Sequence, residues 1–341
     1  MFDNTCTTMN CRIGDVSTGK TDMGTPAMFT VVIPLYNKAD TIDRTLHSLE
    51  QQRYKEFSVV IVDDGSSDNG VAIASEHSQK LRLAIVRQNN AGVSVARNVG
   101  VSHSKSKFVA FLDADDVWHP DFLNEIFRCI ERYPDYSVYG TNYVCETNGR
   151  SICTRSWFGE IGRVDFIKMW PWRCPIHTSS LVVRRDVFVA VGGFVPGHTY
   201  YEDAELLLKL SLKNKFVVSS RVLLRYCMDA QNRVTARPAP FSKMAHWIEI
   251  ERLLGLPSPQ YDVIQLARME VLKVYVYSYL AAQKQEQISI KDLYPRMYEV
   301  AHKKISRFEN PRTVIGVLFA WLYKFYFIFM TRRYTRTWSG R

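Results

Sequence analysis

Short apolar runs alternate along the chain with segments whose apolar positions recur at helical spacing. The runs are rich in β-branched residues and only five to seven residues long, which is typical of strands buried on both faces. The expected strands are 29–34, 57–62, 81–86 and 108–112, with a fifth at 137–143. The expected helices are 40–51, 71–77, 91–102 and 122–132. This alternation predicts an α/β domain built on a mainly parallel, doubly wound sheet.

The pattern becomes less regular beyond residue 149. A short strand at 180–183 and a helix from 201 to 212 complete the predicted α/β domain, which we place at 28–226. Residues 227–305 read mostly as helix and are predicted to form a C-terminal helical extension. Residues 1–27 are predicted to be a flexible leader, and Met28 could be the native start.

The leader contains GDVSTGKT at 14–21, which matches the phosphate-binding pattern G-x-x-x-x-G-K-[ST]. That motif acts only between a buried strand and a helix whose N-terminus helps to hold the phosphates. The flanking residues favour neither element, so we expect no phosphate-binding loop here.

The charge of the chain is concentrated in its last residues. The net charge is +10, and the stretch 301–341 holds nine basic residues against one acid, Glu309. A nucleic-acid-binding protein would more often spread such charge over a folded face, so we expect no nucleic-acid partner. We predict that residues 306–341 associate with a membrane surface.

The apolar centre of this tail, 313–330, carries the single charge of Lys324. Three interpretations stay open: a helix lying in the membrane interface, which we favour, a short membrane span, or a helix packed in the core. The seven cysteines form no C-x-x-C pair and have no zinc-finger spacing, which indicates a reducing compartment. We therefore expect a cytoplasmic protein, peripheral on the inner face of a bacterial-type cell membrane.

Acidic clusters follow the predicted strands. Residues 63–66 close the strand at 57–62, and residues 113–116 close the strand at 108–112. In doubly wound sheets the ligand crevice lies outside the carboxyl ends of the strands, so these clusters should converge there. Paired carboxylates such as Asp113 and Asp115 are suited to a hard divalent cation that in turn binds phosphate oxygens.

Together these segments resemble the family-2 glycosyltransferases. The resemblance rests on four motifs in the family's order and spacing: VIPLYN at 32–37, VDDGSSD at 62–68, NAG with ARNVG at 90–100, and FLDADDVW at 111–118. It covers about 29–226 and implies a GT-A fold with a nucleotide-binding half and an acceptor half. It also implies an inverting transfer from a nucleotide-diphosphate sugar, with Mg²⁺ or Mn²⁺ as cofactor.

The resemblance assigns roles to particular residues. Asp115 and Asp113 would hold the metal, and Asp203 would be the catalytic base, with Glu202 as the next candidate. Ala204 and Glu205 stand where the family often has a large residue. His177 is expected to be structural or to contact the acceptor. The residues expected to line the donor crevice are Pro34, Tyr36, Asp63, Asp64, Asn90, Gly92, Arg97 and Asp113.

The acceptor is expected to be a lipid-linked glycan, such as one on a polyprenyl carrier, in cell-surface polysaccharide assembly. Two other functions stay open. A metal-dependent nucleotidyltransferase would also use paired carboxylates, although its usual Gly-rich first loop is replaced by LYNK at 35–38. A non-catalytic membrane adaptor would use only the basic tail.

Overall fold

The computed structural model describes residues 17–18, 26–155, 162–169, 176–229, 243–267, 270 and 291–305. The predicted membrane-associating tail, 306–341, and most of the predicted leader lie outside these residues. Within the described part, no helix is both long enough and apolar enough to cross a membrane.

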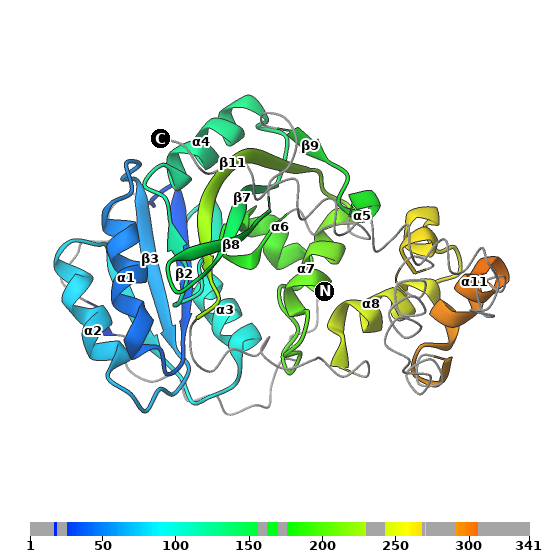
Figure 1. Ribbon diagram of the computed structural model, residues 1–341, viewed down its shortest axis with the longest axis horizontal. Coiled ribbons are helices and arrows are strands. Elements are labelled where there is room, and N and C mark those ends of the chain that lie inside the picture. Colours follow the sequence, from blue (N-terminus) through cyan, green and yellow to red (C-terminus); the bar gives the residue numbers. More distant parts are fainter. Residues whose placement is uncertain are drawn as a thin grey trace, which may run out of the picture.

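The first half of the sheet confirms the predicted parallel arrangement (Figure 1). The strands run parallel in the order β4-β3-β2-β5, so the chain winds first to one side of β2 and then to the other. The crevice between β2 and β5 is therefore a topological switch point, where doubly wound sheets bind ligands. These strands are β2 (Phe29–Leu35), β3 (Phe57–Asp63), β4 (Leu83–Arg87) and β5 (Phe108–Phe111).

Two apolar layers cover the faces of this sheet. Along β2, Val31 and Ile33 belong to one hydrophobic cluster, whereas Val32 belongs to the other, as the two-residue period of a strand requires. The first cluster contains the apolar faces of α1 (Ala39–Glu50), α2 (Gly70–Glu76) and α4 (Phe122–Arg132). The second contains side chains from α3 (Val93–Ser102), α6 (Arg185–Ala190) and α7 (Glu202–Ser211).

The second half of the sheet is antiparallel where it joins the first. Strand β10 (Val182–Arg184) pairs antiparallel with both β5 and β7 (Val138–Thr147). The twelve-residue strand β11 (Phe216–Cys227), which the sequence pattern did not predict, then pairs parallel with β7. Short strands complete this half: β6 (Val117–Trp118), β8 (Arg150–Arg155) and β9 (Gly162–Val164).

The predicted leader contributes one short element to the sheet. Ser17–Thr18 form β1, which pairs antiparallel with β4, so these two residues differ from the expected flexible segment. They lie inside the phosphate-loop-like sequence at 14–21 and are extended along a sheet edge. In a phosphate-binding loop these two residues would belong to the turn between the strand and the helix, whereas here they pair as a strand.

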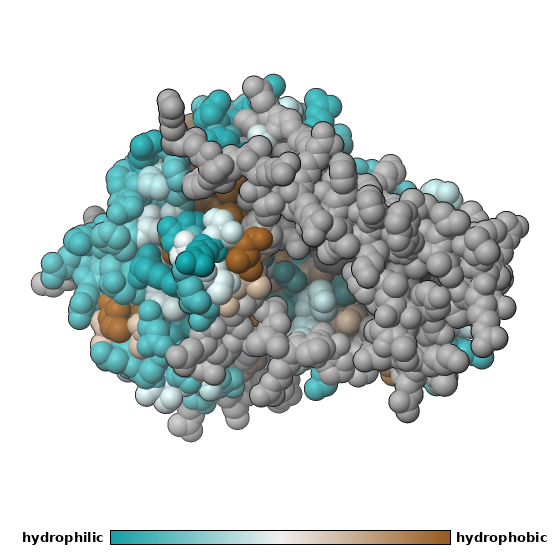
Figure 2. Space-filling view, in the orientation of Figure 1, coloured by the Kyte–Doolittle hydropathy of each residue, from teal (hydrophilic) through white to brown (hydrophobic). Residues whose placement is uncertain are grey.

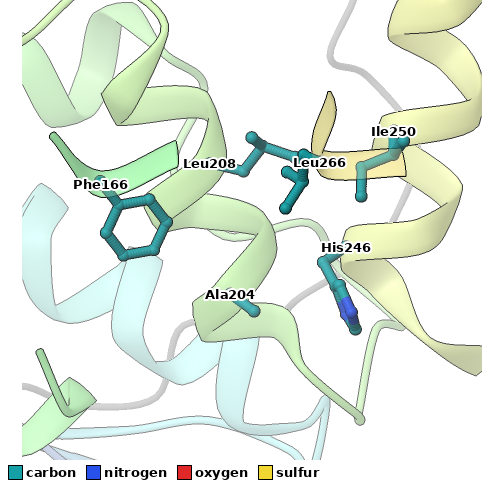
Figure 3. Close-up of a pocket in the computed structure, with 6 residues that line it drawn as sticks. All are labelled: Phe166, Ala204, Leu208, His246, Ile250 and Leu266. Atoms are coloured by element: carbon teal, nitrogen blue, oxygen red, sulfur yellow. The ribbon is translucent and has the colours of Figure 1, made fainter. Parts of the chain in front are cut away.

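The helical extension packs against the sheet domain through α7. Its helices α8 (Ala245–Leu254) and α11 (Pro295–Ile305) share one hydrophobic cluster with Leu208 of α7. Figure 3 shows the seam between the two parts, where Ala204 and Leu208 of α7 face His246 and Ile250 of α8. In the orientation of Figure 1, the surface around α1 and α2, at the far end from this extension, is mainly hydrophilic (Figure 2).

Helix α3 packs closely on β2 because residue 100 is glycine. A Cβ atom on Gly100 would lie 2.3 Å from Cγ1 of Val32, a fully buried side chain. No carbon contact is that short, so any larger residue must push the helix away from the sheet. We expect Gly100→Leu to lower the free energy of unfolding by about 2–3 kcal/mol through overpacking.

Urea unfolding would measure this change. Ser102→Leu is the matched control, because it places the same side chain on the same helix at an exposed position and should change stability by about 0.5 kcal/mol or less. Equal unfolding midpoints for the two variants would contradict the close packing of α3 on β2.

Candidate active site

The acidic clusters meet at the carboxyl ends of the parallel strands, as the sequence predicts. The turn after β2 touches the turn after β3, because the backbone N–H of Asn37 donates to Oγ of Ser66 at 3.1 Å and that of Asp64 donates to the carbonyl of Leu35 at 2.8 Å. The turn after β5 lies beside the start of α1. Three strand ends therefore form one edge lined with carboxylates.

On one side of this edge, Asp64 organises the predicted nucleotide-binding loop. Its carboxylate accepts hydrogen bonds from Nε2 of Gln88 at 2.7 Å and from the backbone N–H groups of Ala91 at 2.7 Å and Gly92 at 2.9 Å. Gly92 has a φ of +91°, which favours glycine, and it precedes the first residue of α3. Asp64 thus fixes the backbone of the loop that the sequence predicts to line the donor crevice.

Four further residues predicted to line the donor crevice lie at the ends of β2 and β3 or in the loops that follow β2 and β4. Asp63 is buried and accepts from the backbone N–H of Ser66 at 2.9 Å. Tyr36 is 48% exposed and Asn90 is also exposed, so both side chains are accessible to a ligand. Pro34 occupies β2 opposite Val62 of β3.

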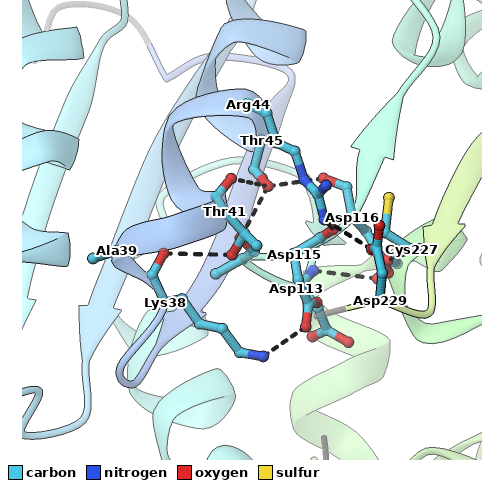
Figure 4. A network of polar contacts seen from close by, with 12 residues as sticks. Lys38, Ala39, Thr41, Arg44, Thr45, Asp113, Asp115, Asp116, Cys227 and Asp229 are labelled. Carbon is cyan, nitrogen blue, oxygen red and sulfur yellow. Dashed lines mark hydrogen bonds and ion pairs between the residues drawn. The ribbon is translucent and has the colours of Figure 1, made fainter. Parts of the chain in front are cut away.

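Helix α1 holds the loop that contains Asp113 and Asp115 (Figure 4). The hydroxyl of Thr41 donates to the carbonyl of Ala114 at 2.9 Å, and that of Thr45 donates to the same carbonyl at 3.0 Å. The guanidinium of Arg44 donates to the carbonyl of Asp115 at 3.0 Å. Side chains on three positions of one helix therefore fix the backbone of this loop.

Lys38, the residue before α1, completes this contact. Its ammonium lies 2.7 Å from Oδ2 of Asp115, and both side chains are largely buried. The sequence analysis assigned no role to Lys38, and nothing in its local pattern distinguishes it from a surface lysine.

Asp116 is a third carboxylate of the same turn, and it faces the interior. It is fully buried and accepts from the hydroxyl of Ser179 and from the backbone N–H of Cys227 at 3.0 Å. Burial and the neighbouring carboxylates of Asp115 and Asp113 raise the pKa of Asp116 well above its ordinary value. Asp116 therefore joins the turn after β5 to the segment at 177–180 and to the end of β11.

Arg97 connects the predicted metal motif to the predicted catalytic pair. Arg97 is 3% exposed, and its guanidinium donates to Asp113 at 2.8 Å and to Glu202 at 3.0 Å. The group also lies over the ring of Phe194, 5.0 Å from its centre. Both pairing nitrogens are directed at protein carboxylates, so Arg97 is a bridge within the site. Its place in the lining of the donor crevice stays a prediction.

Glu202 and Asp203 begin α7, and their side chains have different partners. Glu202 pairs with Arg97, whereas Oδ2 of Asp203 accepts from the hydroxyl of Thr178 at 3.0 Å. The preceding residue, Tyr201, has a φ of +60°, which is uncommon for a bulky side chain and redirects the chain into the helix. Asp203 is thereby turned toward the segment that carries His177.

His177 lies among aromatic and acidic groups. Its ring packs against those of Tyr226 and Tyr143, with centres 4.3 Å and 5.2 Å away, and its Nδ1 accepts from the backbone N–H of Ser179 at 3.1 Å. Burial lowers the pKa of His177, and the nearby carboxylates of Asp113 and Asp203 oppose this only in part. The structural or acceptor-contacting role of His177 stays a prediction.

The carboxylates of the site are tuned in opposite directions. Burial raises the pKa of Glu202 to about 7, with Asp203 adding to the shift and Arg97 opposing it. Burial also acts to raise the pKa of Asp113, but the charge and hydrogen bond of Arg97 outweigh it and hold that pKa below the ordinary value. The carboxylate of Asp113 is therefore ionised at neutral pH.

Asp113 and Asp115 are the residues that could hold a divalent cation. Each has one oxygen paired with a basic side chain. Among the described residues, the other oxygen of each carboxylate has no hydrogen bond or ion pair. Among those residues no group of three or more potential metal ligands occurs. Two carboxylates are nevertheless enough for Mg²⁺, which commonly takes its other ligands from water and substrate phosphates.

Sequence reasoning missed the partners that orient the predicted residues. Asp116 stood in the recognised motif, and its acidity next to a buried strand was a signal. The contributions of Lys38, Thr178 and Ser179 depend on contacts between segments far apart in the chain, for which a single sequence offers no signal.

Known proteins share these motifs and this architecture. Residues 30–195 match the family profile described as Glycosyl transferase family 2. The chain is 31% identical over 215 residues to the amylovoran biosynthesis glycosyltransferase AmsB of Erwinia amylovora, a match that covers 59% of this chain and 69% of AmsB. It is 40% identical over 114 residues to the succinoglycan biosynthesis protein ExoW of Rhizobium meliloti, covering 31% of this chain and 35% of ExoW.

Among solved structures, TarS 1–349 of S. aureus in complex with UDP-GlcNAc superimposes with a TM-score of 0.66. The match covers 81% of this chain and 84% of TarS 1–349 at 19% identity. The similarity to the GT-A fold therefore spans most of the chain. The motif order, the strand-end carboxylates and the similarity to AmsB agree, and the chain belongs to the family-2 glycosyltransferases.

Proposed function

We propose that the protein transfers a sugar from a nucleotide-diphosphate sugar to an acceptor hydroxyl with inversion at the anomeric carbon. The observation that carries the proposal is the bridge formed by Arg97 between Asp113 and Glu202. It brings a carboxylate motif suited to a metal–diphosphate complex next to an acidic pair suited to deprotonating an acceptor. An inverting transfer needs these two functions on opposite sides of the reacting carbon.

The donor side of the proposal uses the residues around the strand ends. Tyr36 and Asn90 are accessible to a nucleoside, and Asp64 fixes the loop that contains Asn90. The TarS structure in complex with UDP-GlcNAc supports a nucleotide-sugar donor for this fold. A Mg²⁺ or Mn²⁺ ion held by Asp113 and Asp115 would supply Lewis-acid stabilisation of the departing diphosphate.

On the acceptor side, we assign the general base to Asp203. Glu202 is committed to Arg97, and its raised pKa leaves much of it protonated near neutral pH, so it is poorly placed to take a proton. Asp203 is partly exposed, and Thr178 and the start of α7 orient its carboxylate. A base fixed in this way can accept the hydroxyl proton as the new glycosidic bond forms.

We propose a glycan acceptor, free or carried on a polyprenyl diphosphate, in the assembly of a cell-surface polysaccharide. AmsB and ExoW support this class of product, since their names place them in amylovoran and succinoglycan biosynthesis. A basic tail at 306–341 would hold the enzyme at the cytoplasmic face of the membrane, where a lipid-linked acceptor is found.

Asp115→Asn tests the metal-dependent donor chemistry. It removes one charge from the predicted metal site without changing side-chain size, so we expect turnover to fall by about a hundredfold or more. The measurement is release of nucleoside diphosphate from a panel of nucleotide sugars with Mn²⁺ or EDTA present. Exposed Asp135→Asn is the control. A variant that is fully active in EDTA would rule out this role of Asp115.

Asp203→Asn tests the base. The amide oxygen can still accept from Thr178, so the fold and nucleotide binding should persist while transfer falls by about a hundredfold or more. Calorimetric titration with the nucleoside diphosphate and NMR of the product report the two effects. Undiminished transfer would reassign the base, and a product that retains the donor's anomeric configuration would reject inversion. Asp186→Asn, in the first turn of α6, is the matched control.

Glu202→Gln tests the electrostatic assignment. With its pKa raised from 4.5 to about 7, folded Glu202 holds a proton that the unfolded chain has released at the pH values in between. The wild-type free energy of unfolding should therefore fall, relative to that of the variant, as the pH rises from 4.5 to 7, by at most about 1.4 kcal/mol per pH unit. Urea unfolding across this range would measure the difference. Exposed Glu131→Gln should leave the wild-type slope unchanged. Parallel profiles for wild type and Glu202→Gln would show that Glu202 ionises normally.

A further inference from the structure

One cation of this chain lies on the carboxylate that we propose as a metal ligand. Lys38 Nζ is 2.7 Å from Oδ2 of Asp115, and the two side chains are 16% and 14% exposed. A divalent ion bound to either oxygen of this carboxylate would lie within several ångströms of the ammonium, where two positive charges repel each other strongly. Lys38 and a metal ion therefore compete for the same carboxylate.

The backbone on the Asp115 side of this contact is held in place. Thr41 and Thr45 bind the carbonyl of Ala114, Thr45 also binds that of Asp116 at 2.9 Å, and Arg44 binds that of Asp115. The backbone of Asp115 cannot follow the ammonium or retreat from it without breaking this set of hydrogen bonds. The Asp115 side chain has two rotatable bonds and the lysine has four, so the larger movement on metal binding falls to the lysine.

The backbone of Lys38 is held too, which confines the movement to its side chain. The preceding residue, Asn37, is tied to the turn after β3, since its N–H donates to Ser66 and its Oδ1 accepts from the N–H of Ser67 at 2.8 Å. The carbonyl of Lys38 accepts the N–H groups of Thr41 and Ile42 as α1 begins. The lysine side chain is a flexible four-carbon stem that can carry the charge to another position.

The other basic group of the motif behaves differently. Arg97 holds Asp113 from a buried position, with a second carboxylate on its other side and an aromatic ring against its face. Displacing that guanidinium would leave Glu202 buried beside Asp203 without its counter-ion, which is costly. The pair that can open is therefore Lys38 with Asp115.

We infer that Lys38 is the resident counter-ion of Asp115 and that a divalent cation must displace its ammonium, so that Lys38 weakens metal binding to the enzyme without donor. This inference deepens the proposed function and rests on its assignment of Asp115 as a metal ligand. Lys38 acts here as a positioning residue that holds the carboxylate of Asp115 in place while no metal ion is bound.

The experiment is calorimetric titration of Mn²⁺ alone into the full-length protein. Lys38→Met should bind Mn²⁺ about tenfold more tightly than wild type, because no ammonium has to be displaced. Lys38→Arg keeps the charge and should bind no more tightly than wild type. Lys209→Met is the matched control, since Lys209 has the same side-chain exposure of 16%. Its ammonium lies 2.8 Å from Glu205, which is not part of the proposed metal site. Lys38→Gln serves as a second neutral variant if Lys38→Met does not fold.

Equal Mn²⁺ affinity in wild type, Lys38→Met and Lys38→Gln would overturn the inference, as would tighter binding that persists when Asp115→Asn is added to Lys38→Met. Failure of the proposed function gives a different result. If Mn²⁺ binds to none of these proteins, even with uridine or guanosine diphosphate present, while nucleotide sugars are still cleaved in EDTA, the metal assignment itself is wrong. The role of Lys38 is supported if Lys38→Met and Lys38→Gln bind Mn²⁺ more tightly than wild type while Lys38→Arg and Lys209→Met do not.

Discussion

The arrangement of the site depends on one buried guanidinium. Arg97 lies between Asp113, at the end of β5, and Glu202, at the start of α7, and these segments are almost ninety residues apart in the chain. Removing one partner from a buried ion pair typically costs about 3–5 kcal/mol, so either carboxylate depends on the arginine to be tolerated at its position. Because Arg97 is on α3, the packing of that helix on β2 influences the distance between Asp113 and Glu202.

The two halves of the sheet differ in how far their sequence predicts them. The parallel half was predictable because each strand is a short, continuous apolar run and each motif follows one of these runs directly. The unpredicted β11 begins with the apolar residues Phe216–Val218 but continues through Ser219, Ser220 and Arg221, which obscure its pattern. Its identity as a strand comes from pairing with β7 some eighty residues earlier, a contact that local propensity does not encode.

A similar division applies to the site. Asp113, Asp115, Asp64 and Asp203 were identifiable from motif and position because each stands at the end of a strand or at the start of a helix. Their partners were not, since the hydroxyls of Thr41 and Thr178 and the ammonium of Lys38 acquire a role only when the chain folds back. Arg97 was identified as a site residue, but its direction toward two carboxylates could be established only in three dimensions.

The contact between the loop before α7 and the helical extension limits how this enzyme can be recombined with its relatives. The carbonyl of Tyr200 accepts the backbone N–H of Ala245 at 3.1 Å, and the ring of Tyr201 packs against that of His246, 4.8 Å between centres. The loop that presents Asp203 is thus supported by α8, a helix beyond the sheet domain. A chimera joined between β11 and α8 would combine the Tyr200–Tyr201 loop of one protein with the α8 helix of another, and these contacts would be lost. A segment exchanged between relatives should therefore run from the loop before α7 through the helical extension.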